Sequence, residues 1–198
     1  MIDFLVQWDK EMFLLLNFNG GSMMDQVMSF CTSKYFNIPL LVPVLFLYFK
    51  NYEWKLVVPV LFVALTIALA DQGSVHLFKN VFQRLRPCHN AELDGLIHLV
   101  QNRCGGLYGF ISSHATNTAA VVTFLWITLF KNKEVWIKTL LLSWLFTVGY
   151  TRIYLGAHYP ADVLVGWIFG WLLGKTVAMI YLKTISEHWI SRSKTIKG

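Results

Sequence analysis

Long apolar runs separated by short polar segments dominate the chain. A helix needs roughly 20 apolar residues to cross a bilayer, so the pattern predicts about five transmembrane helices. They are expected at residues 25–49 (most apolar over 38–49), 56–82, 113–130, 135–154 and 161–182. Residues 3–18 mix acidic, aromatic and aliphatic side chains, a mixture that favours a helix in the membrane interface, although a sixth span beginning there stays open. The predicted fold class is all-α integral membrane: a helix bundle with an N-terminal interfacial helix, in a single domain spanning 1–198.

Composition supports a membrane protein. Hydrophobic residues make up 56% of the 198 residues and charged residues 14%, which leaves too little polar surface for a water-soluble globule of this size. The net charge of +6 does not point to nucleic acid, because the cations collect at the ends of apolar runs. We therefore expect no nucleic-acid partner, and the sequence says nothing of oligomeric state.

Loop charge predicts the orientation in the membrane. Basic residues cluster in the segments on one side of the predicted spans: Lys50, Lys55, Lys131, Lys133, Lys138, Lys183, Arg192, Lys194 and Lys197. The positive-inside rule makes that side cytoplasmic. The acidic N-terminus, the 83–112 segment and the turn around His158 are then expected outside.

Ionisable groups at the edge of a span are costly and need an explanation, and this chain gathers them at the outer ends. Lys79 and Arg86 are seven residues apart, which predicts one helical face two turns apart, with Pro87 ending the helix. Arg152 closes the fourth apolar run.

Two histidines join these cations at the outer ends. His114 follows Ser112 and Ser113, which are candidate caps of a helix whose N-terminus can bind an anion. His158 and Asp162 are four apart, so the carboxylate is expected to accept a hydrogen bond from the imidazole across a helical turn.

Together these residues suit phosphoryl transfer. The reaction needs positive charge around three equatorial oxygens, an in-line nucleophile and an acid for the leaving oxygen. Arginines bind phosphate through forked hydrogen bonds, and a carboxylate on one imidazole nitrogen leaves the other unprotonated for attack. A lone histidine in a membrane protein is more often a structural hydrogen-bonding group, but the full set of residues argues against that interpretation.

The spacing resembles a known family, the type 2 phosphatidic acid phosphatase superfamily. Lys79, six residues, then Arg86-Pro87 is similar to its first signature, and Thr151-Arg152, five residues, His158, three residues, Asp162 to its third. The middle signature, usually Pro-Ser-Gly-His, stands here as Ile111-Ser112-Ser113-His114. The resemblance covers about 71–170 and departs from the family pattern at Ile111, at Ser113 and in having threonine before Arg152.

The resemblance implies a role for each residue. His158 would form a phosphohistidine, Asp162 would orient it, and His114 would protonate the leaving oxygen and then activate water. Phosphate would be held by Lys79, Arg86, Ser112, Ser113 and Arg152. The family implies no cofactor and no metal, so a metal-independent hydrolase is expected.

Several substrates stay open. Small bacterial undecaprenyl pyrophosphate phosphatases are the favoured comparison, with phosphatidate, phosphatidylglycerol phosphate and lipid A as alternatives. Alternatives of another class are an anion transporter and a non-catalytic lipid-binding relative. The expected location is a bacterial inner membrane, with the site facing the periplasm or exterior.

The predicted outer loop holds two further features. Cys88 and Cys104 form either a disulfide or two free thiols, and the three cysteines of the chain make no metal-binding pattern. Arg84 and Arg103 are expected to be surface charges.

Overall fold

The protein is helical throughout the part of the chain that the structure, a computed structural model, describes: residues 2–33, 35–36, 57–102, 104–128 and 135–195. Within these ranges the only β-type pairing is an isolated bridge between Leu85 and Tyr108. The all-α prediction is confirmed. The main helices are α1 (Ile2–Leu16), α2 (Gly21–Cys31), α4 (Val57–Gly73), α5 (Asn80–Phe82), α6 (Ser113–Thr128), α7 (Val135–Tyr154) and α8 (Pro160–Thr195). A π-helical turn, Ser74–Lys79, joins α4 to α5, and short 3-10 turns lie at Pro87–His89, Ala91–Leu93 and Val100–Asn102.

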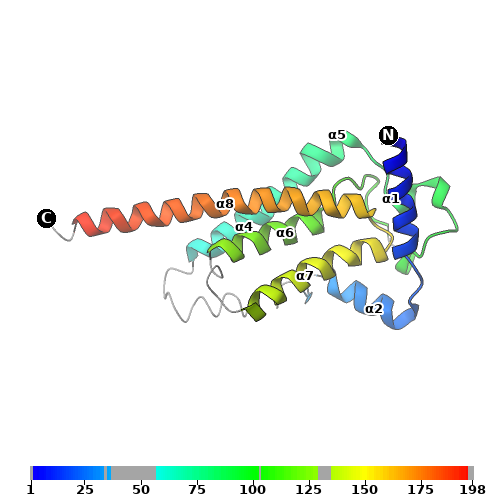
Figure 1. The fold of residues 1–198 in the computed structure, drawn as a ribbon, viewed down its shortest axis with the longest axis horizontal. Coiled ribbons are helices and arrows are strands. Elements are labelled where there is room, and N and C mark those ends of the chain that lie inside the picture. The colour runs from blue at the N-terminus through cyan, green and yellow to red at the C-terminus, as the bar shows by residue number, and fades with distance from the viewer. Residues whose placement is uncertain (1, 34, 37–56, 103, 129–134, 196–198) are drawn as a thin grey trace.

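Helix α6 packs closely along α8, while α4 and α7 flank the pair (Figure 1). Three glycines at intervals of four residues allow this approach. A Cβ added at Gly170 would lie 2.3 Å from the Thr116 carbonyl oxygen, and one at Gly174 would lie 2.3 Å from the Ala120 carbonyl oxygen. At Gly166 it would lie 3.0 Å from the Ser112 carbonyl oxygen. Because small residues line this seam, the start of α6 is held directly against the first turns of α8.

Helix α1 crosses one end of the bundle, the end that the sequence predicts to be outside (Figure 1). Its inner face buries Phe13, whose ring meets Tyr159 edge-on at 5.4 Å. Asn17, the residue that follows the helix, is also buried and donates to the carbonyl oxygens of Tyr154 at 2.7 Å and His98 at 3.0 Å. The other face of α1 exposes large apolar side chains, among them Leu15 at 71%. This two-sided character fits the interfacial helix that the sequence predicts.

The sides of the bundle are apolar and exposed, as contact with lipid requires. Among the described residues, two helices are long and apolar enough to cross a membrane, Val58–Phe82 and Pro160–Thr184, and both coincide with predicted spans. Large exposed apolar side chains on these two helices are Leu61, Leu65, Leu69, Leu164, Ile168, Trp171 and Leu172. Helices α6 and α7 fall within the predicted spans 113–130 and 135–154.

The first predicted span is the least well tested. Its start is occupied by α2, which ends at Cys31, and residues 37–49 lie outside the described part of the chain.

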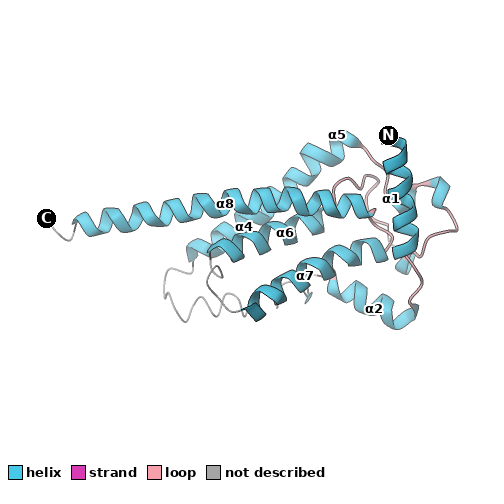
Figure 2. Cartoon of the chain, in the orientation of Figure 1, coloured by secondary structure: helices cyan, strands magenta, loops and turns pink. Residues whose placement is uncertain are grey.

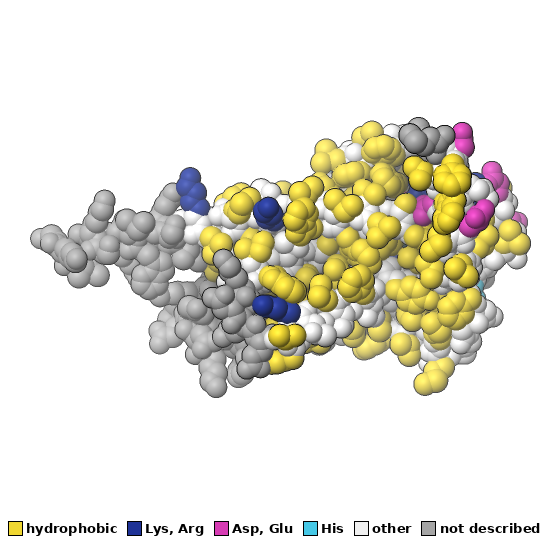
Figure 3. All heavy atoms as spheres, viewed as in Figure 1, with side chains coloured by type: hydrophobic (Ala, Val, Ile, Leu, Met, Phe, Trp, Pro, Cys, Tyr) yellow, Lys and Arg dark blue, Asp and Glu magenta, His cyan; other side chains and the backbone are white. Residues whose placement is uncertain are grey.

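The two ends of the bundle differ in charge. Acidic side chains gather around α1, and the visible Lys and Arg groups lie mostly toward the far end of α8 (Figure 3). The loops between Gln83 and Ser112 also lie at the α1 end, opposite the C-terminal end of α8 (Figure 2). The predicted outer segments therefore share one end of the molecule.

Candidate active site

His158 lies in the tight turn that joins α7 to α8. Gly156, with φ +75°, adopts the left-handed conformation that ends α7. The His158 backbone N–H then donates to the carbonyl oxygen of Arg152 at 3.1 Å. The His158 side chain is 2% exposed. The turn therefore holds a buried imidazole beside the last turn of α7.

Asp162 faces this imidazole from the first turn of α8. Its Oδ2 lies 3.5 Å from His158 Nδ1 and accepts the Tyr159 backbone N–H at 3.0 Å. The second contact is that of a capping box, in which a side chain in the first turn returns to the cap residue. His158 precedes α8, so this arrangement, and not the helical i to i+4 spacing expected from the sequence, brings the two residues together.

The His158–Asp162 separation is longer than an ordinary hydrogen bond, and Nδ1 has no hydrogen-bond partner among the described residues. Hydrogen bonds in active sites are often long before substrate binds. The Asp162 side chain is itself fully buried, and its Oδ1 accepts from Arg84 at 2.8 Å. One carboxylate oxygen is thus left facing the imidazole.

Lys79 and Arg86 reach the site from different elements, so the prediction of a shared helical face is wrong. The helix that carries Lys79 ends at Phe82, because Gln83 takes a left-handed conformation with φ 48°. Arg86 is extended with ψ 157°, as the residue before a proline prefers. Lys79 itself ends a π-helical turn, a feature often found at functional sites.

Lys79 is held by hydroxyl groups. Its ammonium donates to Ser113 Oγ at 2.6 Å, and Ser113 Oγ lies 2.6 Å from Ser74 Oγ. Arg86 is held by backbone carbonyls instead, since its Nε donates to Tyr108 at 3.3 Å and its Nη1 to Cys104 at 3.2 Å.

Arg152 completes the set of cations. Its Nη1 donates to Thr32 Oγ1 at 2.9 Å, and its buried Nε has no partner among the described residues. Within that same part of the chain, no carboxylate forms an ion pair with Lys79, Arg86 or Arg152. Three positive groups thus meet neutral oxygens only, which leaves their charge available to an anionic ligand.

These cations surround His158 closely enough to change its titration. Burial is the largest cause that lowers the pKa of the His158 imidazole well below its ordinary value, and Arg152, Arg86 and Lys79 lower it further. The imidazole is therefore neutral at pH 7, the form with a free nitrogen lone pair.

Ser112 and His114 enter from the start of α6. Ser112 Oγ accepts the Ala115 backbone N–H at 3.4 Å, so the predicted cap is confirmed at Ser112. The Ser112 backbone N–H donates to the Asp162 carbonyl oxygen at 3.0 Å and ties this end of α6 to α8. His114, in the first turn, is exposed. One histidine of the site is thus open and the other buried.

The structure brings all three signature segments to one place. The first meets the second through Lys79 and Ser113, and the second meets the third through Ser112 and Asp162. Gly109 lies between the first and third: a Cβ there would be 3.1 Å from Arg86 Cγ and 3.2 Å from Asp162 Oδ2.

The expectation that Arg84 is a surface charge is wrong. Its side chain is 24% exposed and bridges Asp162 and Asp9, at 2.8 and 2.7 Å. Asp9 shares the inner face of α1 with Phe13, four residues later. An acidic residue on an otherwise buried helix face is the signal that the sequence analysis missed. Arg103 lies outside the described residues.

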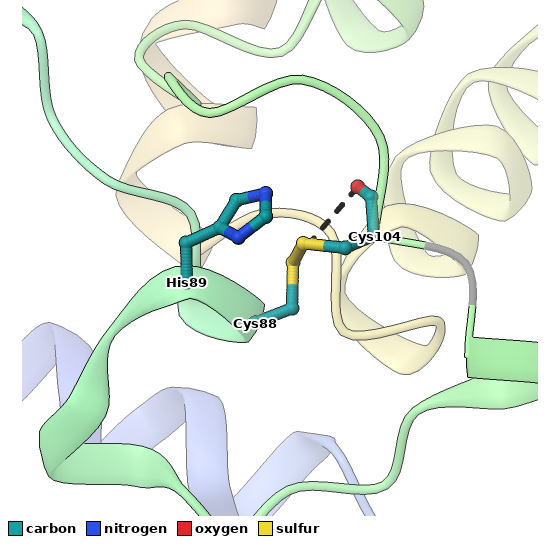
Figure 4. A group of neighbouring side chains, drawn as sticks. All are labelled: Cys88, His89 and Cys104. Carbon is teal, nitrogen blue, oxygen red and sulfur yellow. Dashed lines mark hydrogen bonds between the residues drawn. A yellow bond between two sulfur atoms is a disulfide. The ribbon is translucent and has the colours of Figure 1, made fainter.

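Cys88 and Cys104 form a disulfide beside the site (Figure 4). The bond spans 16 positions of sequence, with the two Cα atoms 5.8 Å apart. Together with His89, the two sulfur atoms resemble the corner of a metal site. A disulfide leaves no thiolate to bind a metal, so these residues form a covalent cross-link between two parts of the loop and not a metal centre.

An apolar groove of about 520 Å³ lies between α6, α7 and α8. The α6 residues lining it, including Val122 and Trp126, form a stripe turned away from Ser113 and His114. The groove is therefore separate from the cluster of ionisable groups.

Comparison with known proteins identifies the family. The model of the PAP2 superfamily matches residues 40–186. The chain belongs to the PAP2 superfamily. Among curated relatives of this PAP2 protein, a lipid A 4'-phosphatase of Bacteroides thetaiotaomicron is 37% identical over 86% of this chain and 75% of its own length.

Two further curated relatives are more distant. A lipid A 4'-phosphatase of Porphyromonas gingivalis is 29% identical over 97% of this chain and 80% of its own. An undecaprenyl-diphosphatase of Sulfolobus acidocaldarius is 29% identical over 83% and 74%.

Solved structures share the fold. Aquifex aeolicus LpxE superposes with a TM-score of 0.59 at 25% identity, over 87% of this chain and 93% of its own. The PAP2-type phosphatidylglycerolphosphate phosphatase of Bacillus subtilis gives 0.67 at 23% identity, over 90% and 87%. The PAP2 protein described here is therefore a membrane lipid phosphatase, a hydrolase, as the sequence predicts.

Proposed function

We propose that the protein removes phosphate from a membrane lipid at its outer end, with His158 as the nucleophile. The observation that carries this proposal is the setting of His158: a buried, neutral imidazole faces Asp162 at 3.5 Å, among three cations that have no carboxylate partner in the described chain. A buried positive cluster of this kind is costly without an anion. A phosphate group supplies that anion and the electrophile together.

The proposed reaction has two steps. His158 Nε2 attacks phosphorus in line, the bond to the leaving oxygen breaks, and His114 gives that oxygen its proton. Asp162 accepts a hydrogen bond from Nδ1–H and stabilises the positive charge that the ring gains. In the second step His114 takes a proton from water, the hydroxide attacks phosphorus, and the phosphorus–nitrogen bond breaks. Inorganic phosphate leaves and His158 returns to its neutral form.

The remaining site residues are proposed to bind the transferred group. Lys79, Arg86 and Arg152 would balance the charge that spreads over its equatorial oxygens. Ser112 and Ser113 lie where α6 begins, and the free N–H groups of a helix start favour an anion. The exposed position of His114 suits a group that must meet both a leaving oxygen and a water molecule.

Two substrate classes are supported by relatives. The two lipid A 4'-phosphatases support a sugar phosphate of a glycolipid, and the Sulfolobus enzyme supports undecaprenyl diphosphate. The short chain and the predicted outward-facing site favour the diphosphate, whereas the 37% identity to the Bacteroides enzyme favours the glycolipid as strongly. We propose the glycolipid phosphate and the polyprenyl diphosphate as equal candidates for the substrate.

The protein is further proposed to be a single domain with about five spans in a bacterial inner membrane. Its active site would face the periplasm or the exterior. An anion transporter, the alternative of another class, would need polar groups along a path through the bilayer, but Lys79 and Arg86 lie together beside the start of α6 and the 104–108 loop.

A substrate panel tests the proposal. Purified protein in detergent is given lipid A, undecaprenyl diphosphate, phosphatidate and phosphatidylglycerol phosphate, with and without EDTA, and phosphate release is measured. We expect turnover of one of the first two, unaffected by EDTA. Release from none of the four, or activity that depends on added metal, would contradict the proposal.

A further inference from the structure

Helix α1 reaches the candidate active site through one carboxylate, that of Asp9. Asp9 Oδ1 accepts the backbone N–H of Ala161 at 2.8 Å, in the first turn of α8. Asp9 Oδ2 accepts from Arg84 Nη2 at 2.7 Å. The side chain of Asp9 is only 10% exposed, so both contacts lie away from solvent.

Arg84 extends this chain of contacts to Asp162. Its Nη1 donates to Asp162 Oδ1 at 2.8 Å, and its guanidinium lies 4.1 Å from the centre of the Tyr159 ring. One guanidinium thus joins two carboxylates and stacks on the residue that separates His158 from α8. A planar, rigid fork of donors is well suited to fix a carboxylate in one orientation.

The two carboxylate oxygens of Asp162 consequently have different partners. Oδ1 is engaged by Arg84, while Oδ2 accepts from the Tyr159 N–H and faces His158 Nδ1. If Arg84 released Oδ1, the carboxylate could turn about its last bond and the oxygen opposite Nδ1 would no longer be fixed.

We propose that Arg84 and Asp9 are positioning residues for phosphoryl transfer: they hold Asp162 in the orientation that keeps the His158 proton on Nδ1. The proposal rests on the function proposed above, in which His158 is the nucleophile. Neither residue touches the phosphate, and both act through Asp162. Through Asp9, the interfacial helix α1 then supports the catalytic residues and is not only a membrane contact.

Asp9 also has two separable contributions. Its oxygen on Ala161 caps α8, and its charge balances Arg84. Asn in its place keeps an oxygen for the cap and removes the charge. Burial raises the pKa of Asp9, and the Ala161 N–H and the Arg84 guanidinium both oppose that rise, so both contacts favour the ionised carboxylate.

Steady-state kinetics of the full-length protein on one lipid substrate test the proposal. We expect Arg84→Gln to lower kcat by about 10–100-fold, as loss of an outer partner of a functional histidine does, with little change in KM. Asp9→Asn should lower kcat less than Arg84→Gln, and Arg84→Lys should recover part of the loss. Adding Asp9→Asn to Arg84→Gln should cost little more, because both act through one chain of contacts.

Lys10→Gln is the matched control. Lys10 neighbours Asp9 on α1 and pairs with Glu92, an ion pair that ties α1 to the same outer loops without reaching Asp162. Its kcat should stay near that of the wild type. An equal loss of kcat in Lys10→Gln and Asp9→Asn would mean that α1 acts only as a structural support, and would overturn the proposal.

The remaining outcomes distinguish failure of the positioning role from failure of the proposed function. A wild-type kcat in Arg84→Gln, or a change confined to KM, overturns the positioning role. If Arg84→Gln does not fold, Asp9→Asn and Arg84→Lys give the same decision, since wild-type kcat in both contradicts it. His158→Ala is measured alongside, and turnover in that variant would refute the proposed function itself.

Discussion

The ammonium of Lys79 donates to the hydroxyl of Ser113 at 2.6 Å, and this contact joins the first and second signature segments. The PAP2 pattern usually has glycine at the position of Ser113. In this chain the added side chain does not point into empty space but bridges Lys79 and Ser74. The departure from the family pattern thus creates a support for one of the phosphate-site cations.

Ser113→Ala should therefore weaken phosphate binding. A hydrogen bond to a charged group contributes on the order of 1.5 kcal/mol, so we expect kcat/KM to fall about tenfold, mainly through KM. Thr128→Ala is the control, because Thr128 lies at the other end of α6 and its hydroxyl bonds within the helix at 2.7 Å. Equal kinetics for Ser113→Ala and the wild type would show that Lys79 needs no such support.

The titration of His158 predicts a pH dependence of stability. Its pKa in the folded protein lies well below the ordinary value of about 6.5, so the unfolded chain binds a proton that the folded one does not. Stability should therefore fall as pH drops below about 6.5, and no such loss should occur above it. Thermal unfolding in detergent between pH 7.5 and pH 5 (~2.5 units, spanning that value) measures this.

His158→Asn removes this one titrating group and should make the dependence shallower. His89→Asn is the matched control, since His89 is an exposed histidine of the outer loop, and it should keep the slope of the wild type. An unchanged slope in His158→Asn would contradict a neutral, buried His158.

The disulfide predicts sensitivity of phosphate binding to reduction. The carbonyl oxygen of Cys104 accepts from Arg86, so the residue that closes the loop also holds a phosphate-site cation. Closing a loop of this size is worth around 3 kcal/mol in the chain-entropy model. Reductant should lower the melting temperature and raise KM, and Cys88→Ser should do the same without reductant.

Cys31→Ser is the control for reduction, because Cys31 is the free cysteine of the chain. This variant should behave as the wild type, with and without reductant. Quantitative alkylation of Cys88 and Cys104 in unreduced protein would contradict the disulfide.

Orientation in the membrane is tested by labelling. Gly95 lies in the loop at the α1 end and Thr184 near the far end of the apolar part of α8. In a Cys31→Ser background, Gly95→Cys should react with an impermeant maleimide in intact cells. Thr184→Cys should react only after permeabilisation. The reverse pattern would contradict an outward-facing site.

The sequence predicted the members of the site better than their geometry. Hydrophobic runs locate spans because the bilayer leaves few alternatives, and the signature spacing selected Lys79, Arg152 and His158. The prediction of one continuous helix from Lys79 to Arg86 was wrong, because the helix ends at Gln83. Gln83 takes a left-handed conformation, which the sequence does not indicate because the residue is not glycine.

Long-range pairs were harder to predict. Arg84 and Asp9 are separated by 75 positions, and nothing local in the sequence records that they meet. Pairing of Cys88 and Cys104 was left open for another reason: it depends on an oxidising compartment, which the sequence does not specify, and the folded loop brings the two residues within bonding distance.

Labelling of the phosphoenzyme tests the central claim most directly. Protein is mixed with a phosphorus-labelled aryl phosphate, quenched in denaturant, and assayed for covalent label that is labile in acid and stable in base. Aryl phosphates have good leaving groups, so their transfer to His158 depends less on a general acid, whose usual contribution is ~10²–10⁴-fold. His114→Ala should therefore still form the intermediate, but lack the base that activates water.

We expect label to accumulate in His114→Ala and to be absent from His158→Ala. His76→Ala, an exposed histidine bonded to Gln72 four residues earlier, should turn over like the wild type. Label that persists in His158→Ala would contradict the assignment of the nucleophile.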